Sequence, residues 1–296
     1  MPPVSAPPAR IRVIDLETAG TLPTDVCEIG WQDVVQGADG RWAVNAGRGA
    51  AFVNPGRPIS AATMAIHHIL DAEVAGAPFW KDAAPPVLRP AGGVLALAAH
   101  RAAFEQRFCT PGLSGGAAWI CTWKCALRLW PHLQSFSNQM LRYQRMPEGL
   151  DHATGLPAHR AMPDAYVTAH HLRDMLNEAS VEQLLAWSRE PGLLPRVPRG
   201  PDRGKSWAAV GLDEVRALAR ERDVDVRFSA ETELRRRGRG WRRWWRGSGI
   251  RGCCRRNPWR RGGRCLCIAE ANGAVEKERP QRSGPRGLRP IPDWMV

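Results

Sequence analysis

An apolar run that ends abruptly in acidic residues is the feature that most constrains this chain. Residues Ile11 to Ile14 are mostly β-branched, and the polar stretch from Asp15 to Gly20 follows at once. This pattern predicts a buried strand that ends in a turn. Residues at i and i+2 of a strand point to the same face, so Asp15 and Glu17 are expected side by side. Two such carboxylates stay ionised together most easily around a divalent cation. A pair of solvated turn acids is the alternative.

Strand and helix patterns follow one another from residue 10 to Ala179. Apolar runs predict strands at 11–14, 26–35, 42–53, 94–98 and 119–122. Helical spacing and capping residues predict helices at 60–75, 102–108, 122–130 and 164–176. This order predicts an α/β domain over residues 10–179, preceded by a disordered N-terminus at 1–9.

The chain after Ala179 is expected to be a short helical extension. Ser180 and Gln183 form a capping box that begins a helix. A Pro- and Gly-rich segment at 191–204 is typical of a linker, and 212–222 is a further helical pattern. We refer to residues 180–234 as the C-terminal extension.

The positive charge of the protein is concentrated in its last residues. The whole sequence has a formal net charge of +13. Residues 235–296 hold seventeen arginines and one lysine against four acids, so this tail carries +14 and residues 1–234 carry −1. The isoelectric point therefore says nothing about nucleic-acid binding by the folded body. The Arg/Trp/Gly-rich tail is predicted to be disordered. The alternatives are a basic aromatic arm that binds nucleic acid and a segment read out of frame from a G- and C-rich gene.

The lengths of the apolar runs indicate where in the cell the protein is expected. The longest apolar stretch, 92–99, is under half of the roughly 20 residues that a membrane span requires. The N-terminal residues show no apolar run of a secretory signal. We therefore expect a cytoplasmic protein with no membrane partner, whose eight cysteines are reduced thiols.

Two further acidic positions lie where predicted strands end or helices begin. His159 and Asp164 have the spacing H-x-x-x-x-D, and Pro163 suits the first turn of a helix. The histidine is thus a candidate base beside a candidate metal-binding carboxylate. Glu105 follows His100 one turn into another predicted helix. Taken singly, Asp164 is also explained as a helix cap and Glu105 as a solvated first-turn acid.

Three stretches resemble the motifs of the DEDD exonucleases, in the subclass whose third motif carries a histidine. They are Val13-Ile14-Asp15-Leu16-Glu17-Thr18, residues 100–105 and residues 159–164. Further likeness to exonuclease X-type members lies in Arg57-Pro58-Ile59-Ser60 with Met64-Ala65-Ile66-His67, in Trp119-Ile120-Cys121-Thr122 with Leu129-Trp130-Pro131, and in His159-Arg160-Ala161 with Asp164-Ala165-Tyr166. The resemblance covers about residues 10 to 190. It implies an RNase H-like fold, with a mixed central sheet flanked by helices.

The resemblance also implies roles for individual residues. Asp15 would bridge two Mg²⁺ or Mn²⁺ ions, and Glu17 and Asp164 would complete the site of the first ion. Glu105 would hold the second ion and His159 would take a proton from the attacking water. The predicted catalytic set is Asp15, Glu17, Glu105, His159 and Asp164, and the predicted substrate-binding set is Thr18, His100 and Arg101.

This sequence departs from the family pattern at its second motif. The family usually has His-Asn followed by a terminal Asp, whereas this chain has His100-Arg101 and Glu105. The resemblance implies a 3′-5′ exonuclease that releases nucleoside 5′-monophosphates from DNA 3′ ends. An exoribonuclease of the same fold and a nucleic-acid-binding module without catalysis remain the alternatives. The oligomeric state is open.

Overall fold

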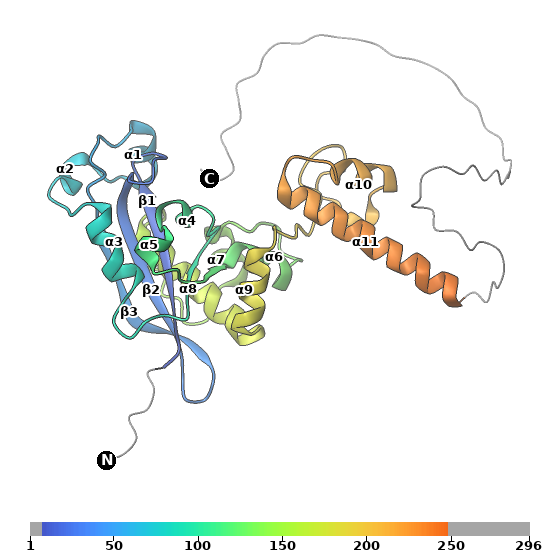
Figure 1. The fold of residues 1–296 in the computed structure, drawn as a ribbon, viewed down its shortest axis with the longest axis horizontal. Helices are drawn as coiled ribbons and strands as arrows, with labels where there is room; N and C mark the ends of the chain where they lie inside the picture. The colour runs from blue at the N-terminus through green and yellow to red at the C-terminus, as the bar shows by residue number, and fades with distance from the viewer. Residues whose placement is uncertain (1–7, 248–296) are drawn as a thin grey trace, which may run out of the picture. The chain divides into compact units, whose positions relative to one another are not determined.

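A mixed five-stranded sheet forms the centre of the computed structural model, which describes residues 8–247 and their side chains up to Gly238 (Figure 1). The strands are β1 (Arg10–Thr18), β2 (Val26–Gln36), β3 (Trp42–Phe52), β4 (Ala96–Ala99) and β5 (Trp119–Cys121). Their order is β3-β2-β1-β4-β5. β1, β2 and β3 pair antiparallel, and β4 and β5 run parallel to β1. The carboxyl ends of β1, β4 and β5 therefore meet at one edge of the sheet.

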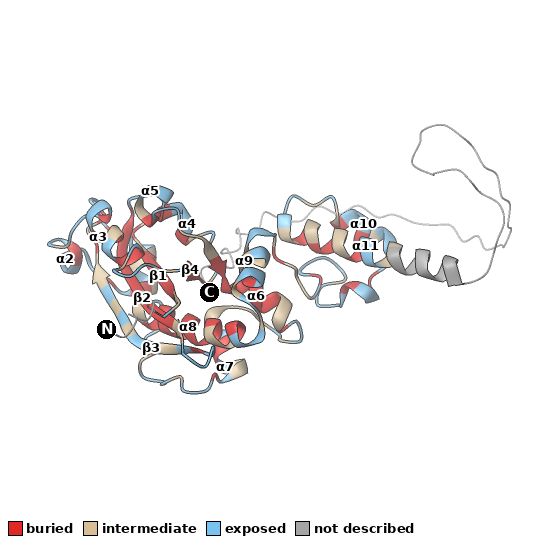
Figure 2. Ribbon diagram, turned by 60° about the horizontal axis from the view of Figure 1, so that its bottom comes forward, coloured by how far each residue is buried: buried red, intermediate tan, exposed pale blue. Residues whose placement is uncertain are grey.

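Alternate residues of β1 face two different cores. Ile11 and Val13 pack in a cluster with Ala165 and other residues of α8 (Ala161–Glu178). Ile14 and Leu16 pack in a second cluster with residues of α3 (Trp80–Leu88). Figure 2 shows this burial as largely red β1, β2 and α8, beside a mostly tan and pale blue β3. Helices thus cover both faces, and the expected RNase H-like fold is confirmed.

The remaining helices of the first 190 residues are short. They are α1 (Ala61–His67), α2 (Asp71–Val74), α4 (Glu105–Phe108), α5 (Pro111–Ser114), α6 (Thr122–Leu129), α7 (Asn138–Arg145) and α9 (Val181–Arg189). Ser180 accepts the N-capping bond predicted for it, and Ser60 caps α1 in the same way. The single helix predicted at 60–75 is wrong, because His68 adopts a left-handed conformation that ends α1. The helix predicted at 102–108 begins only at Glu105.

The C-terminal extension has a small core of its own beyond α9. It contains a 3₁₀ turn η1 (Trp207–Ala209), α10 (Leu212–Leu218) and the start of α11 (Val224–Gly247). Buried residues of this core come from all three elements and from the preceding loop: Val197, Trp207, Val210, Val215, Leu218, Val226 and Ala230. The predicted linker at 191–204 has no helix or strand, although Arg196 and Ser206 form an isolated bridge.

The expectation of a disordered tail from residue 235 needs correction at its beginning. α11 continues to Gly247, and both Arg236 and Arg237 pair with Glu233 one turn earlier. Such i,i+3 and i,i+4 pairs and the good helix propensity of arginine favour continuation of the helix. By contacts the chain divides into units at 1–239 and 240–296. The expectations for residues 1–7 and 248–296 lie outside the described residues.

The structure also bears on two sequence predictions, the absence of a membrane-spanning helix and the reduced state of the cysteines. No helix in the described part of the chain is long and apolar enough to cross a membrane. The described cysteines, Cys27, Cys109, Cys121 and Cys125, are all buried and free. Burial strongly disfavours their thiolates and raises the pKa of Cys125 to about 12.

Candidate active site

Three carboxylates meet at the carboxyl end of β1. Asp15 and Glu17 share the period-2 face of Ile11 and Val13, which is the face that packs against α8. Asp164 lies in the first turn of α8. One ligand oxygen from each of Asp15, Glu17 and Asp164 lies within 4.8 Å of the other two. The two predicted acidic pairs, far apart in the sequence, are therefore brought together.

Close approach of α8 to the sheet depends on a glycine. Gly30 of β2 pairs with Asp15 across the sheet. A Cβ at this position would lie 2.1 Å from the backbone carbon of Ala161, so only glycine leaves room for the first turn of α8. This contact helps to bring Asp164 down to the acids of β1.

Neutral donors orient Asp164. Its Oδ2 accepts a 2.7 Å hydrogen bond from the backbone N–H of His159. Its Oδ1 accepts a 2.7 Å bond from Nε2 of Gln139 and a 3.4 Å contact from Nδ2 of Asn138, both on α7. Sequence reasoning missed these two amides, because nothing in the local pattern of residues 138–145 indicates that α7 packs on α8.

His159 lies in the loop directly before α8. Its side chain is exposed, and its backbone has a φ of 59°, in the left-handed region. This turn allows the backbone N–H to reach Asp164, whose carboxylate also feels the imidazole electrostatically. The predicted base is therefore held beside the acid cluster by its own main chain.

An ion pair between a buried acid and a half-buried arginine fixes the start of α8 to β2. Arg160 donates from Nε and from one Nη to the two carboxylate oxygens of Glu28, at 3.0 and 2.6 Å. Glu28 also accepts the backbone N–H of Ala161 at 2.9 Å. Glu28 lies directly opposite Glu17 in the β1–β2 ladder. The sequence offered one signal for this anchor, an acid within an apolar strand, but gave no means to find its partner.

Glu105 occupies a separate position near the cluster. Its side chain is 3% exposed, and Oε2 has no hydrogen-bond partner among the described residues. It is not part of the three-acid group, yet its charge acts on Asp15 and Glu17. The alternative of a solvated first-turn acid is wrong for Glu105, because the side chain is buried.

Burial raises the pKa values of all four acids, and repulsion from neighbouring acids adds to this rise at Asp15 and Glu17. Burial is the largest cause for Asp15, followed by repulsion from Asp164, Glu17 and Glu105, and its pKa is well above the ordinary value. The pKa of Glu17 rises for the same reasons. Burial raises the pKa of Glu105 to about 8. The pKa of Asp164 also rises through burial, although its hydrogen bonds oppose the change.

The chemistry of this donor set fits hard divalent cations. No lysine or arginine among the described residues forms an ion pair with Asp15, Glu17, Glu105 or Asp164. Arg160, the cation that acts on Glu17, is already paired with Glu28. An oxygen-only site with uncompensated negative charge, including the orphaned Oε2 of Glu105, suits Mg²⁺ or Mn²⁺.

The three predicted substrate-binding residues lie around the same edge of the sheet. Thr18 is half-buried at the end of β1. His100 follows β4, and its two ring nitrogens contact the hydroxyl of Thr122 and the carbonyl of Phe136. Burial lowers the pKa of His100 to about 4, so the ring is neutral and bridges three segments. Arg101 is exposed. Substrate contact by these residues stays a prediction.

Comparison with known proteins finds sequence relatives and similar solved structures. No protein-family model matches the chain. Exodeoxyribonuclease 10 of Escherichia coli K12 is 37% identical over 198 residues, which cover 66% of this chain and 83% of the relative. A DNA polymerase III subunit epsilon-like protein of Rhodobacter capsulatus is 41% identical over 101 residues, or 32% of this chain and 13% of the relative. Among solved structures, exonuclease X in complex with 5′ overhanging duplex DNA is 34% identical, with a TM-score of 0.49, and covers 60% of this chain and 99% of that chain.

The fold and the sequence relatives together define an RNase H-like exonuclease. The chain belongs to the exodeoxyribonuclease 10, or exonuclease X, family. The resemblance drawn from the sequence motifs is thereby confirmed.

Proposed function

We propose that this protein is a 3′-5′ exonuclease that depends on two Mg²⁺ or Mn²⁺ ions and releases nucleoside 5′-monophosphates from DNA. The observation that carries the proposal is the meeting of Asp15, Glu17 and Asp164 within 4.8 Å at one strand end. His159, bonded through its backbone to Asp164, supplies a titratable group beside them. We take residues 10–179 as the exonuclease domain and the cytoplasm as its location, in keeping with the free thiols in the described part of the chain.

The proposal gives each side chain a role. Asp15, Glu17 and Asp164 would hold one ion, and Asp15 and Glu105 would hold the second. When bound, the ions stabilise charge on the attacking and leaving oxygens of an in-line displacement at phosphorus. The exposed imidazole of His159 accepts the proton of the attacking water. The backbone bond from His159 to Asp164 keeps base and carboxylate in a fixed relation.

Binding of the 3′ end is proposed for the rim of the site. The carboxyl end of β1 holds Thr18, and the residues just after β4 are His100 and Arg101. The 3′ end of a DNA strand bound at the acid cluster would pass these residues. The E. coli relative is named as an exodeoxyribonuclease, which favours DNA over RNA as substrate.

The test is digestion of a DNA oligonucleotide labelled at its 5′ end. With Mg²⁺ we expect stepwise shortening and release of 5′-mononucleotides, and no reaction in EDTA. Asp15→Asn and His159→Ala should each lower kcat by at least about a hundredfold. Asp82→Asn and His132→Ala change an exposed acid and an exposed histidine outside the site and serve as matched controls.

Three outcomes would contradict the proposal or a part of it. Undiminished digestion by Asp15→Asn would show that the acid cluster is not the active site. Faster trimming of a matched RNA oligomer than of DNA would favour the exoribonuclease alternative. Binding of 3′ ends in EDTA without turnover in Mg²⁺ or Mn²⁺ would favour the module without catalysis.

A further inference from the structure

Arg101 is held in a backbone conformation that its residue type disfavours. Its φ is 61°, in the left-handed region, where asparagine and glycine are usual and a long side chain costs free energy. Strain of this kind persists where the surrounding structure and function require a particular residue. Arg101 is the second residue after β4 and is exposed, so packing of the side chain in a core does not explain an arginine here.

The guanidinium of Arg101 is positioned by stacking alone. It lies over the ring of Trp123 at 4.4 Å from the ring centre. It forms no hydrogen bond or ion pair with any residue in the described part of the chain, so its N–H groups face solvent. A guanidinium stacked on an aromatic face keeps its planar edge free for bidentate contact with a phosphate.

The register of the sheet places Arg101 at the rim of the acid cluster. Val13 pairs with Ala98 in the parallel β1–β4 ladder. β4 ends at Ala99 while β1 continues past Asp15 to Thr18, so His100 and Arg101 leave the sheet next to the carboxyl end of β1. A nucleic-acid strand whose last phosphate reaches Asp15 therefore carries its neighbouring phosphates past this rim. A cation there offsets the repulsion between the acid cluster and the strand.

The C-terminal extension supports the ring on which Arg101 stacks. Trp123 is only 8% exposed, and a Cβ added to Gly192 would lie 2.7 Å from its Cζ3. Gly192 in turn donates its backbone N–H to Asp225 of α11 at 2.6 Å. The hydroxyl of Ser229, also on α11, accepts from the backbone N–H of Leu194 at 2.8 Å and lies 3.3 Å from the carbonyl of Gly192. α11 thus fixes the segment that closes over Trp123.

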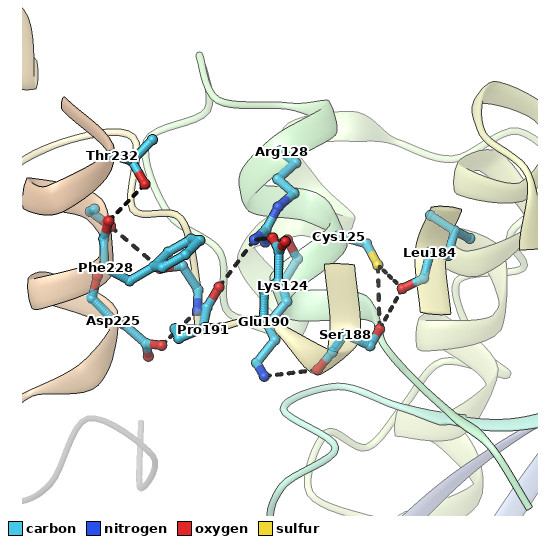
Figure 3. A network of polar contacts seen from close by, with 12 residues as sticks. Lys124, Cys125, Arg128, Leu184, Ser188, Glu190, Pro191, Asp225, Phe228 and Thr232 are labelled. Carbon is cyan, nitrogen blue, oxygen red and sulfur yellow. Dashed lines mark hydrogen bonds and ion pairs between the residues drawn. The ribbon is translucent and has the colours of Figure 1, made fainter. Parts of the chain in front are cut away.

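Further contacts hold the same segment from the other side. Arg128 of α6 donates to the carbonyl of Pro191 at 3.1 Å and to Glu190 at 2.8 Å. Its guanidinium also lies over the ring of Phe228 of α11 at 6.0 Å. Figure 3 shows Arg128, Pro191 and Asp225 in this junction between α6 and α11. The loop that carries Gly192 is therefore tied to helices on both sides.

We propose that Arg101 binds a backbone phosphate of the DNA strand that enters the active site, and that the C-terminal extension positions Arg101 through Gly192 and Trp123. This inference rests on the proposed exonuclease function and names the contact that holds its substrate. Arg101 is a binding residue, whereas Trp123, Gly192 and Asp225 are positioning residues.

The first experiment replaces Arg101 by asparagine in the full chain. Asparagine suits the left-handed backbone, so Arg101→Asn should unfold at an equal or higher temperature than the parent protein. We expect KM for single-stranded DNA to rise about tenfold and kcat to change by less than about twofold. The slope of log affinity against log salt concentration should become shallower by about 0.7, as for one lost contact to a single strand.

A matched charge control separates local binding from net charge. Arg41 is exposed beside the β2–β3 turn, at the opposite end of the sheet from the acids. Arg41→Ala should leave KM and the salt slope unchanged. Inorganic phosphate at millimolar concentration should not compete with DNA for Arg101, since a single phosphate lacks the tethering of a strand. An Arg101→Asn variant with unaltered KM and salt slope would overturn the inference.

The second experiment tests the role of the extension. Gly192→Ala should displace Trp123 and raise KM several-fold with a shallower salt slope. Gly211→Ala, where an added Cβ meets nothing within 4 Å, should have no such effect. In the Arg101→Asn background, Gly192→Ala should raise KM no further, because both changes act on one contact. Additive effects on KM would refute positioning through Trp123.

Failure of this inference and failure of the exonuclease proposal give different results. If the parent protein digests DNA and Arg101→Asn behaves identically, only the inference falls. If the parent protein binds DNA in EDTA with a salt slope that depends on Arg101 but releases no nucleotide with either metal, only the exonuclease proposal falls.

Discussion

Replacing Glu105 by glutamine tests the electrostatics of the site in the metal-free protein. Glu105 is 3% exposed, and burial raises its pKa from 4.5 to about 8. Glutamine has nearly the same shape and no charge. The protonated glutamate and the glutamine each leave one polar group without a partner at the position of Oε2. The free-energy cost of that buried group therefore largely cancels when the two proteins are compared.

The sign and size of the effect follow from proton linkage. Below pH 4.5 the carboxyl is protonated in the folded and unfolded chains, and Glu105 costs nothing. As the pH rises from 4.5 to 8, the unfolded chain loses the proton while the folded chain keeps it, so the free energy of unfolding falls by about 1.4 kcal/mol per pH unit. The loss reaches about 3 kcal/mol at pH 7 and levels off near 5 kcal/mol above pH 8.

The assay is thermal or urea unfolding in EDTA at several pH values. Relative to the parent, Glu105→Gln should gain about 3 kcal/mol between pH 4.5 and pH 7, or about 9 °C in Tm. Glu148→Gln changes an exposed acid and should show no such gain. Added Mg²⁺ should stabilise the parent more than the variant, because bound ions favour the ionised acid. A difference in stability that stays constant from pH 5 to pH 8 would refute the burial argument.

Three further predictions concern the supports of the site. Arg160→Lys loses the two-point contact with Glu28, so kcat should fall about tenfold and the free energy of unfolding by about 1–2 kcal/mol. Steady-state kinetics and urea unfolding measure these two quantities. An unchanged kcat would argue against a role of this ion pair in positioning the site. Gly30→Ala places a Cβ 2.1 Å from the backbone of α8 and should cost at least about 3 kcal/mol in urea unfolding, whereas Gly76→Ala, with open space around it, should not. Ser180→Ala removes a helix cap and should cost about 1 kcal/mol without loss of kcat.

Local patterns were enough to predict the strands and to place the candidate acids at strand ends and helix starts. The hairpin of β2 and β3, the strand that ends at Asp15 and the helix that begins before Asp164 all have signals within a few residues. Burial on a period of two and helix capping are properties of short segments, so one sequence reveals them. The parallel pairing of β1 and β4, which brings their carboxyl ends to one edge of the sheet, is seen only in the structure.

Other features depend on contacts that no short segment contains. α3 was missed because Pro85 and Pro86 lie inside it, and prolines normally end a helix. Its apolar face packs on the sheet strongly enough to override that signal. The bond between Glu28 and Arg160 joins residues 132 positions apart, and only the folded chain brings them together.

The arrangement of charge explains how the site combines metal ions with an anionic substrate. Asp164 is oriented by neutral donors, and Glu28 neutralises Arg160, so no side-chain cation occupies the cluster and its oxygens are available to cations from solution. A protein arginine paired directly with these acids would compete with the ions and weaken their binding. The cation that attracts the DNA strand must therefore lie outside the cluster and without a carboxylate partner. Arg101, exposed at the rim and stacked on Trp123, meets both conditions.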